Sequence, residues 1–169
     1  MTSSVASVGA PEIARVDSLI GQESRRLYLI AFSILRNAAE AEDAVQETLV
    51  KALRGWSWDG ASSPPPAWLT RVCVNQCLNT HRNMVNRIRL ARLAGARHGD
   101  RSDEPESPFH LDLERAFLAL SARQRAALAL HYYHGYSVEE SAALMGTRPG
   151  TVKSHLARAL ERLRREMTP

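Results

Sequence analysis

The spacing of apolar residues constrains this chain most, because it follows a helical period along most of the sequence. From Leu27 to Leu35, apolar residues recur at i, i+3, i+4, i+7 and i+8, which places them on one side of a helix. A second stripe of the same kind runs from Ala41 to Leu53. No segment shows the sustained alternation of a half-buried strand. The sequence therefore predicts an all-α fold.

Turn-forming residues divide the predicted helices into two groups. A Gly/Ser/Pro-rich segment, 55–66, ends the second helix, and the third helix then runs from near Pro66 to about Arg82. The stretch 87–108 contains two glycines and two prolines, and its charge changes from basic to acidic, as is typical of a linker. We expect two small helical domains, at 11–86 and 111–169, joined by a flexible linker at 87–110.

The second domain has the pattern of a helix-turn-helix. Ser121 is placed to cap a helix that ends near Gly135, and Ser137 is placed to cap a short helix that ends near Met145. A tight turn begins at Gly146, and a long helix follows, from about Pro149 to Met167. Two helices joined by a short glycine-containing turn are typical of DNA-binding domains.

The long C-terminal helix has an apolar side and a basic side. Its apolar side is formed by Val152, Leu156, Leu160 and Leu163, which fall within an arc of about 80°. Residues 148–165 carry six basic side chains and one acidic one, a net charge of +5 within a chain of net charge +4. Arginines and hydroxyls on an exposed helix suit the major groove of DNA, although a solvated face of a structural hairpin has the same composition. The candidate DNA-binding residues here are Arg148, Thr151, Lys153, Ser154, Arg158 and Arg162.

Several classes of protein are disfavoured by composition. Hydrophobic residues make up 44% and charged residues 24%, which is typical of a globular protein. No apolar run approaches the roughly 20 residues that cross a bilayer, and the N-terminus lacks the pattern of a signal peptide. We therefore expect a cytoplasmic protein without membrane insertion.

Catalytic and metal-binding patterns are weak. Cys73 and Cys77 lie four residues apart on the inward side of the third helix, so we interpret them as buried structural residues, with a redox pair as the lesser alternative. No Cys/His spacing matches a zinc site, and no Ser/His/Asp or paired-carboxylate arrangement has supporting context. We expect no enzyme activity, no metal and no cofactor.

Two motifs resemble those of a known family. The stretches 120–125 (LSARQR), 136–142 (YSVEESA) and 150–159 (GTVKSHLARA) resemble region four of bacterial sigma factors, closest to the extracytoplasmic-function group. They also resemble the helix-turn-helix of LuxR-type regulators. The segment 41–48 (AEDAVQET) resembles the signature of region two of the same sigma factors, and the two motifs together favour that family. A LuxR-type regulator that binds DNA unaided is the second interpretation, and a helical nucleic-acid enzyme is the third.

The resemblance implies a role for three surfaces. The face opposite the apolar stripe of the second helix would dock on the clamp helices of the largest RNA polymerase subunit, and the polymerase flap is a further expected partner. The residues of this face are Asp43, Gln46, Glu47 and Val50. The third helix would bind the melted minus-ten element, and the last helix would read the minus-thirty-five element of promoter DNA. The minus-ten residues, which share one side of the helix, are Trp68, Arg71, Asn75, Asn79 and Arg82.

The loop before the third helix is expected to hold a flipped base. Trp56 and Trp58 lie in it, and the alternative for both is that they cover the edge of the core. Sigma factors of this group are often held inactive by an anti-sigma factor, so such a partner is a further expectation.

Overall fold

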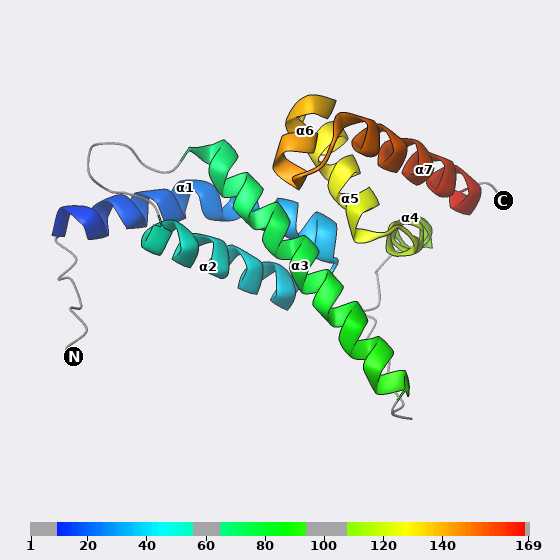
Figure 1. Ribbon diagram of the computed structural model, residues 1–169, viewed down its shortest axis with the longest axis horizontal. Coiled ribbons are helices and arrows are strands. Elements are labelled where there is room, and N and C mark those ends of the chain that lie inside the picture. The colour runs from blue at the N-terminus through cyan, green and yellow to red at the C-terminus, as the bar shows by residue number, and fades with distance from the viewer. Residues whose placement is uncertain (1–9, 56–64, 94–107, 168–169) are drawn as a thin grey trace.

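The computed structural model describes residues 10–55, 65–93 and 108–167, and these are almost entirely helical, with no strand among them. The all-α prediction is confirmed. Trp56, Trp58 and most of the predicted linker lie outside the described residues. The helices, shown in Figure 1, are α1 (Ala10–Leu35), α2 (Ala38–Gly55), α3 (Pro66–Leu93), α4 (Pro108–Ala119), α5 (Ala122–Leu128), the π-helical segment η1 (Ala129–Tyr133), α6 (Val138–Met145) and α7 (Pro149–Met167).

The first lobe consists of α1, α2 and α3, which pack against one another. The predicted stripe on α1 is buried, and Leu27, Ile30 and Ile34 have no exposed surface. Arg36 adopts a φ of 56° at the turn that follows α1. The side chain of Asn37 then accepts a hydrogen bond of 3.0 Å from the N–H of Glu40 and so caps the start of α2.

Helix α3 is longer than predicted. The sequence pattern placed its end at about Arg82, and the helix continues to Leu93, past the predicted start of the linker at Arg87. The prediction was wrong because no Gly or Pro interrupts residues 83–93, so no residue that breaks a helix ends it at Arg82. The last part of α3 projects from the body of the molecule (Figure 1).

The second lobe consists of α4 to α7, and both predicted serine caps are confirmed. Ser121 and Gln124 form a capping box at α5, and Ser137 and Glu140 form another at α6. Gly146 ends α6 in the left-handed conformation, with a φ of 61°. The sequence pattern did not predict η1, where the helix after α5 widens before it ends near Gly135.

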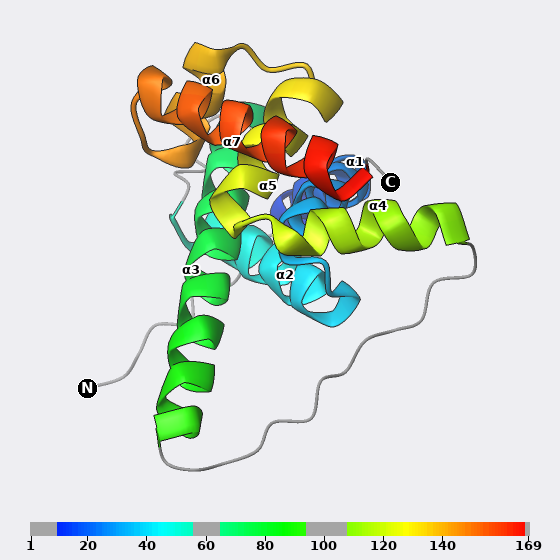
Figure 2. The same ribbon diagram turned by 90° about the vertical axis from the view of Figure 1, so that its right-hand side faces the viewer.

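The two lobes pack on each other. Figure 2 shows the second lobe seated over α1 and α3, and the contacts are made by α5, η1 and α6. The buried apolar residues of both lobes form one contiguous cluster. The helices of both domains therefore share a core, an arrangement that the sequence pattern did not predict.

Candidate functional site

The candidate polymerase-binding face lies on α2. Asp43, Gln46 and Glu47 are exposed, and Val50 is half-buried beside them. The opposite side of α2 is anchored in the core by the buried residues Ala41, Ala44, Val45, Thr48 and Ala52. Since one side of the helix is fixed by packing, the other side presents its acidic and amide groups on a rigid element.

Lys51 borders this acidic face. Lys51 lies 3.8 Å from the carboxylate of Glu47, and its Nζ donates a 2.6 Å hydrogen bond to Oε1 of Gln76 on α3. Both members of the ion pair are about half exposed, at 46% and 49%, so the pair is screened by water and adds little stability. Within the part of the chain that the structure describes, Asp43 and Gln46 are exposed and make no such contact, which leaves their polar groups accessible to a basic partner.

The candidate minus-ten row runs along α3. Arg71, Asn79 and Arg82 are exposed, whereas Asn75 is half-buried and its Nδ2 donates a 2.8 Å hydrogen bond to the carbonyl of Arg71. Trp68 is half-buried and packs against the core. The row therefore combines guanidinium and amide groups, which bind phosphates and base edges, with an indole at one end.

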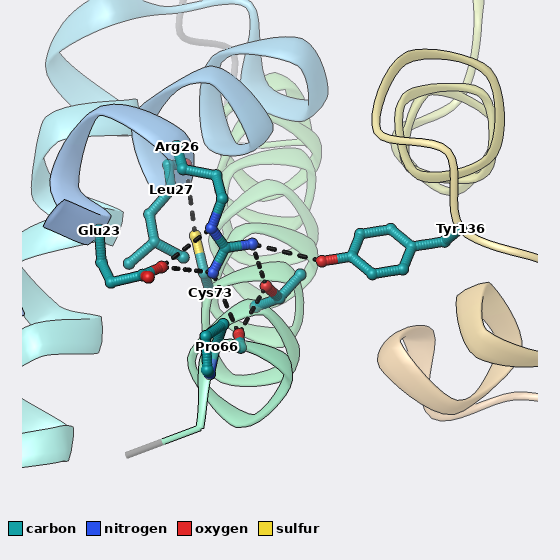
Figure 3. A network of polar contacts seen from close by, with 7 residues as sticks. Glu23, Arg26, Leu27, Pro66, Cys73 and Tyr136 are labelled. Atoms are coloured by element: carbon teal, nitrogen blue, oxygen red, sulfur yellow. Dashed lines mark hydrogen bonds and ion pairs between the residues drawn. The ribbon is translucent and has the colours of Figure 1, made fainter. Parts of the chain in front are cut away.

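Arg26 fixes the start of α3, and the sequence pattern did not identify it. Its Nη1 donates to the hydroxyl of Thr70 at 2.7 Å, and its Nη2 donates to the carbonyl of Pro66 at 3.1 Å. Glu23 holds the guanidinium from the other side, with a 2.9 Å hydrogen bond from Nε. Figure 3 shows Arg26 between Glu23 and Tyr136, so this side chain ties α1 to the beginning of the candidate DNA row.

The candidate minus-thirty-five face lies on α7. Val152, Leu156 and Ala159 are buried and Leu160 and Leu163 pack partly against the core, which confirms the predicted apolar side. All six candidate residues are exposed: Arg148, which directly precedes α7, and Thr151, Lys153, Ser154, Arg158 and Arg162 on the helix. The hydroxyl of Ser154 donates to the carbonyl of Gly150 at 3.0 Å and keeps its lone pairs for another donor. Figure 1 shows α7 running away from the first lobe toward the C-terminus.

His155 lies next to the basic side of α7. Partial burial, and then the charges of Arg123 and Arg158, lower the pKa of its imidazole below the ordinary value. The ring therefore carries less positive charge at neutral pH than a free imidazole does, and arginine and lysine supply most of the positive charge of this face.

The two cysteines are buried in α3, as predicted, and neither is in a disulfide. The hydrogen bond to Cys73, together with burial, raises the pKa of the Cys77 thiol. Sγ of Cys73 lies 3.7 Å from the carbonyl of Leu27, within hydrogen-bond distance for sulfur. Buried thiols in this setting pack as small apolar groups.

The described ranges hold no group of three or more His, Cys, Asp or Glu residues that could bind a metal ion. None of the helices in those ranges is long and apolar enough to cross a membrane.

The three candidate surfaces lie on separate helices. Helix α2 packs on α1 and α3 with the side opposite the candidate face. Helix α3, in contrast, also contacts α5 and α6 of the second lobe.

Besides Arg26, the sequence analysis missed Arg125, which is only 4% exposed. Its position between Ala122 and Leu128 on the apolar side of α5 is the one sequence signal that places it in the interior.

Comparisons with known proteins agree with both motifs. The family model Sigma-70 region 2 matches residues 19–87, and the model Sigma-70, region 4, matches residues 110–163. The ECF RNA polymerase sigma factor SigM of Mycobacterium tuberculosis is 33% identical over 152 residues, which cover 88% of this chain and 75% of SigM. SigL of the same species is 32% identical over 168 residues, which cover 95% of this chain and 93% of SigL.

A solved structure has the same architecture. The sigma factor RpoE from Bartonella quintana, in a co-crystal with the anti-sigma factor NepR, matches with a TM-score of 0.68 and 29% identity, over 90% of this chain and 96% of RpoE. None of these matches supports the LuxR-type interpretation. Two sigma-70 domains in this order and relatives that align along most of the chain establish that the protein belongs to the sigma-70 family, as an RNA polymerase sigma factor of the extracytoplasmic-function group.

Proposed function

We propose that this sigma factor docks on core RNA polymerase through the α2 face formed by Asp43, Gln46, Glu47 and Val50. The observation that carries the proposal is the exposure of three polar side chains on a helix whose other side is buried. The clamp helices of the largest polymerase subunit are the proposed partner, as the family resemblance implies. Acidic and amide groups held at fixed spacing can bind basic side chains of such a helix pair.

Two further surfaces bind promoter DNA in this proposal. The row Trp68, Arg71, Asn75, Asn79 and Arg82 on α3 binds the melted minus-ten element by stacking and by contacts to phosphates and base edges. The α7 face, led by Thr151, Ser154 and Arg158, enters the major groove at the minus-thirty-five element, and the second lobe also contacts the polymerase flap.

The protein acts as a specificity subunit and not as an enzyme in this proposal, since the polymerase performs the chemistry. It needs no cofactor of its own, and its partnership with polymerase places it in the cytoplasm. Two small lobes with separate surfaces bind promoters strongly only when polymerase holds both, because linkage raises the effective concentration of the second contact. An anti-sigma factor is a further proposed partner, by analogy with the RpoE–NepR complex.

In vitro transcription tests the polymerase contact. Bacterial core RNA polymerase would be combined with this protein on fragmented DNA from the source genome, and new transcripts would be mapped. We expect discrete transcripts with the wild type and their loss in the double variant Asp43→Ala, Glu47→Ala. Glu42→Ala serves as the matched control, because Glu42 is an exposed acid on the same helix but lies to one side of the face.

Direct binding to polymerase separates docking from later steps. The double variant is expected to lose affinity for core polymerase while its helical content stays unchanged, since both side chains are exposed. Full transcription by the double variant would refute the assignment of this face. Tight promoter binding by the protein alone would contradict the proposed dependence on polymerase.

A further inference from the structure

A groove lies between α3 and the beginning of α5. The two helices contact each other (Figure 2), and the groove beside their contact has a volume of about 290 Å³. One wall comes from residues 78–86 of α3 and the other from residues 121–123, where α5 begins. Pockets for small molecules have volumes of about 300–1,000 Å³, so this groove has the size for one small ligand.

Helix α3 lines the groove with an apolar stripe and a polar stripe. Leu78 and Val85 are two turns apart and share one side of the helix. Asn79, Arg82 and Asn86 follow at the spacing i, i+3 and i+7, so they form a polar row beside this apolar stripe. All three polar side chains are exposed. A ligand in the groove therefore meets apolar surface next to two amides and a guanidinium.

The beginning of α5 supplies a second guanidinium. Arg123 is exposed and lines the wall opposite Arg82. The hydroxyl of Ser121 accepts a 3.3 Å hydrogen bond from the N–H of Gln124, which leaves its own O–H to donate to a ligand. Among the described residues, no acidic side chain lines the groove. Two positive charges without an acidic neighbour favour an anion.

Arg125 holds the α5 wall in place. Its Nε donates to the carbonyl of Ile34 on α1 at 2.6 Å, and its Nη1 donates to the carbonyl of Leu120 at 2.7 Å. Burial, and then the charge of Arg36, lower the pKa of Arg125 to about 10, so it remains charged at neutral pH. Because Arg125 joins α5 to α1, the two walls of the groove stand in a fixed relation to each other.

The groups in the groove match the parts of a nucleotide. A guanidinium binds phosphate oxygens through two parallel hydrogen bonds, and two guanidinium groups face the groove from opposite walls. An asparagine amide has a donor and an acceptor side by side, which suits the edge of a purine base. The apolar stripe offers a surface to the face of that base. A simple inorganic anion would use only the arginines.

We propose that this groove binds a free purine nucleotide. Arg82 and Arg123 hold its phosphate from the two walls, and Ser121 donates to a phosphate oxygen. The base lies on Leu78 and Val85, and the amide of Asn86 binds its edge. The small volume of the groove limits the ligand to a single nucleotide.

The same site has a consequence for promoter binding. Asn79 and Arg82 line the groove and also belong to the proposed minus-ten row. A bound nucleotide and the minus-ten strand therefore compete for these two side chains. This competition rests on the proposed function, whereas nucleotide binding by the free protein does not.

Isothermal titration calorimetry tests the site in the full-length protein. The probes are AMP, GMP, ribose 5-phosphate and inorganic phosphate, in a buffer without magnesium, because the ion would neutralise the phosphate. We expect AMP or GMP to bind with one-to-one stoichiometry and at least about tenfold more tightly than the two probes without a base. Such a difference corresponds to one well-made hydrogen bond together with apolar contact.

Two substitutions separate the phosphate and base contacts. Arg123→Ala should weaken nucleotide binding at least about tenfold, since it removes a charged hydrogen-bond donor. Asn86→Ala should bring the affinity for the nucleotide close to that for ribose 5-phosphate. Arg115→Ala on α4 and Arg87→Ala on α3 are the matched controls, because both arginines are exposed and neither lines the groove. Circular dichroism checks that each variant keeps its helical content.

Three results would overturn the proposal. The first is no binding of either nucleotide, or binding that Arg123→Ala leaves unchanged. The second is equal affinity for nucleotides and inorganic phosphate, because the groove would then hold only an anion. The third is a single-stranded pentanucleotide that binds through Arg123 more tightly than AMP and GMP, since the groove would then belong to the DNA-binding row.

Promoter binding without nucleoside triphosphates tests the competition. The protein would be incubated with the tighter of the two monophosphates before core polymerase and promoter fragments are added. We expect promoter binding to fall several-fold with the wild type and to be far less sensitive in Arg123→Ala. Undiminished promoter binding at a saturating nucleotide concentration would refute the competition. If the wild type gives no transcripts with polymerase, the proposed function fails, and calorimetry on the free protein still decides whether the groove binds a nucleotide.

Discussion

Gly146 allows a direct test of how the turn before α7 is built. Its φ of 61° and ψ of 40° lie in the left-handed region, which costs a residue with a Cβ about 1–2 kcal/mol. A Cβ at this position would meet Oδ1 of Asn75 at 3.8 Å, an ordinary contact, so steric overlap adds no further cost. Gly146→Ala is therefore expected to lower the free energy of unfolding by about 1–2 kcal/mol, all of it from backbone strain.

Gly150 provides the matched control. It lies in the first turn of α7 without a positive φ, and a Cβ there would have no neighbour within 4 Å. Gly150→Ala is expected to raise the free energy of unfolding by up to about 1 kcal/mol, because alanine loses less backbone entropy in a helix.

Urea unfolding followed by circular dichroism measures both variants. For a slope of about 2 kcal/mol per molar urea, the two midpoints should separate by roughly 1 M, with Gly146→Ala below the wild type and Gly150→Ala at or above it. A midpoint for Gly146→Ala equal to that of the wild type would refute the left-handed turn. Equal destabilisation by both substitutions would show that the region does not tolerate a methyl group, and that strain is not the cause.

Three further outcomes are expected. Ser137→Ala removes the capping box of α6 and should cost about 1 kcal/mol of stability, measured by urea unfolding. Burial lowers the pKa of His81 and of His134, with smaller effects from Arg125 and Arg26 respectively, so these histidines bind protons more readily in the unfolded chain. The free energy of unfolding should therefore be highest above about pH 6.5, the pKa of an unfolded histidine, and should decrease as the pH falls toward the lowered folded values. This pH dependence should be shallower in His134→Gln. Arg158→Ala should weaken promoter binding by the holoenzyme about 5- to 150-fold (about 1–3 kcal/mol) at constant salt, while an exposed arginine on α4 changed in Arg115→Ala should have little effect.

The candidate surfaces could be predicted because each depends on one helix. The period of apolar residues determines which side of α2 or α7 is buried, and the polar residues on the other side follow from that period. The cysteines of α3 were placed inside by the same argument, and they are buried. The C-terminal end of α3 was predicted wrongly, because the helix continues past Arg82 wherever no glycine or proline interrupts it, whether or not its apolar spacing is amphipathic.

The contacts of Asn75 show what such reasoning could not include. The helical period places this residue on the outer row of α3, and in the fold it is half-buried beside Gly146. A helical wheel describes one element, whereas the cover on Asn75 comes from a turn that lies 71 residues further along the chain.

The sequence by itself determined most of the helices, the serine caps at Ser121 and Ser137, the turn at Gly146 and the polar faces of α2 and α7, because these depend on residues within one or two turns of each other. Only the tertiary structure decided that the lobes share a core, that Arg125 lies buried between two helix ends, and that the α2 face stays open while the α3 row is partly covered. The physical reason is that these features arise where distant segments meet, and no local pattern specifies which buried surfaces pair.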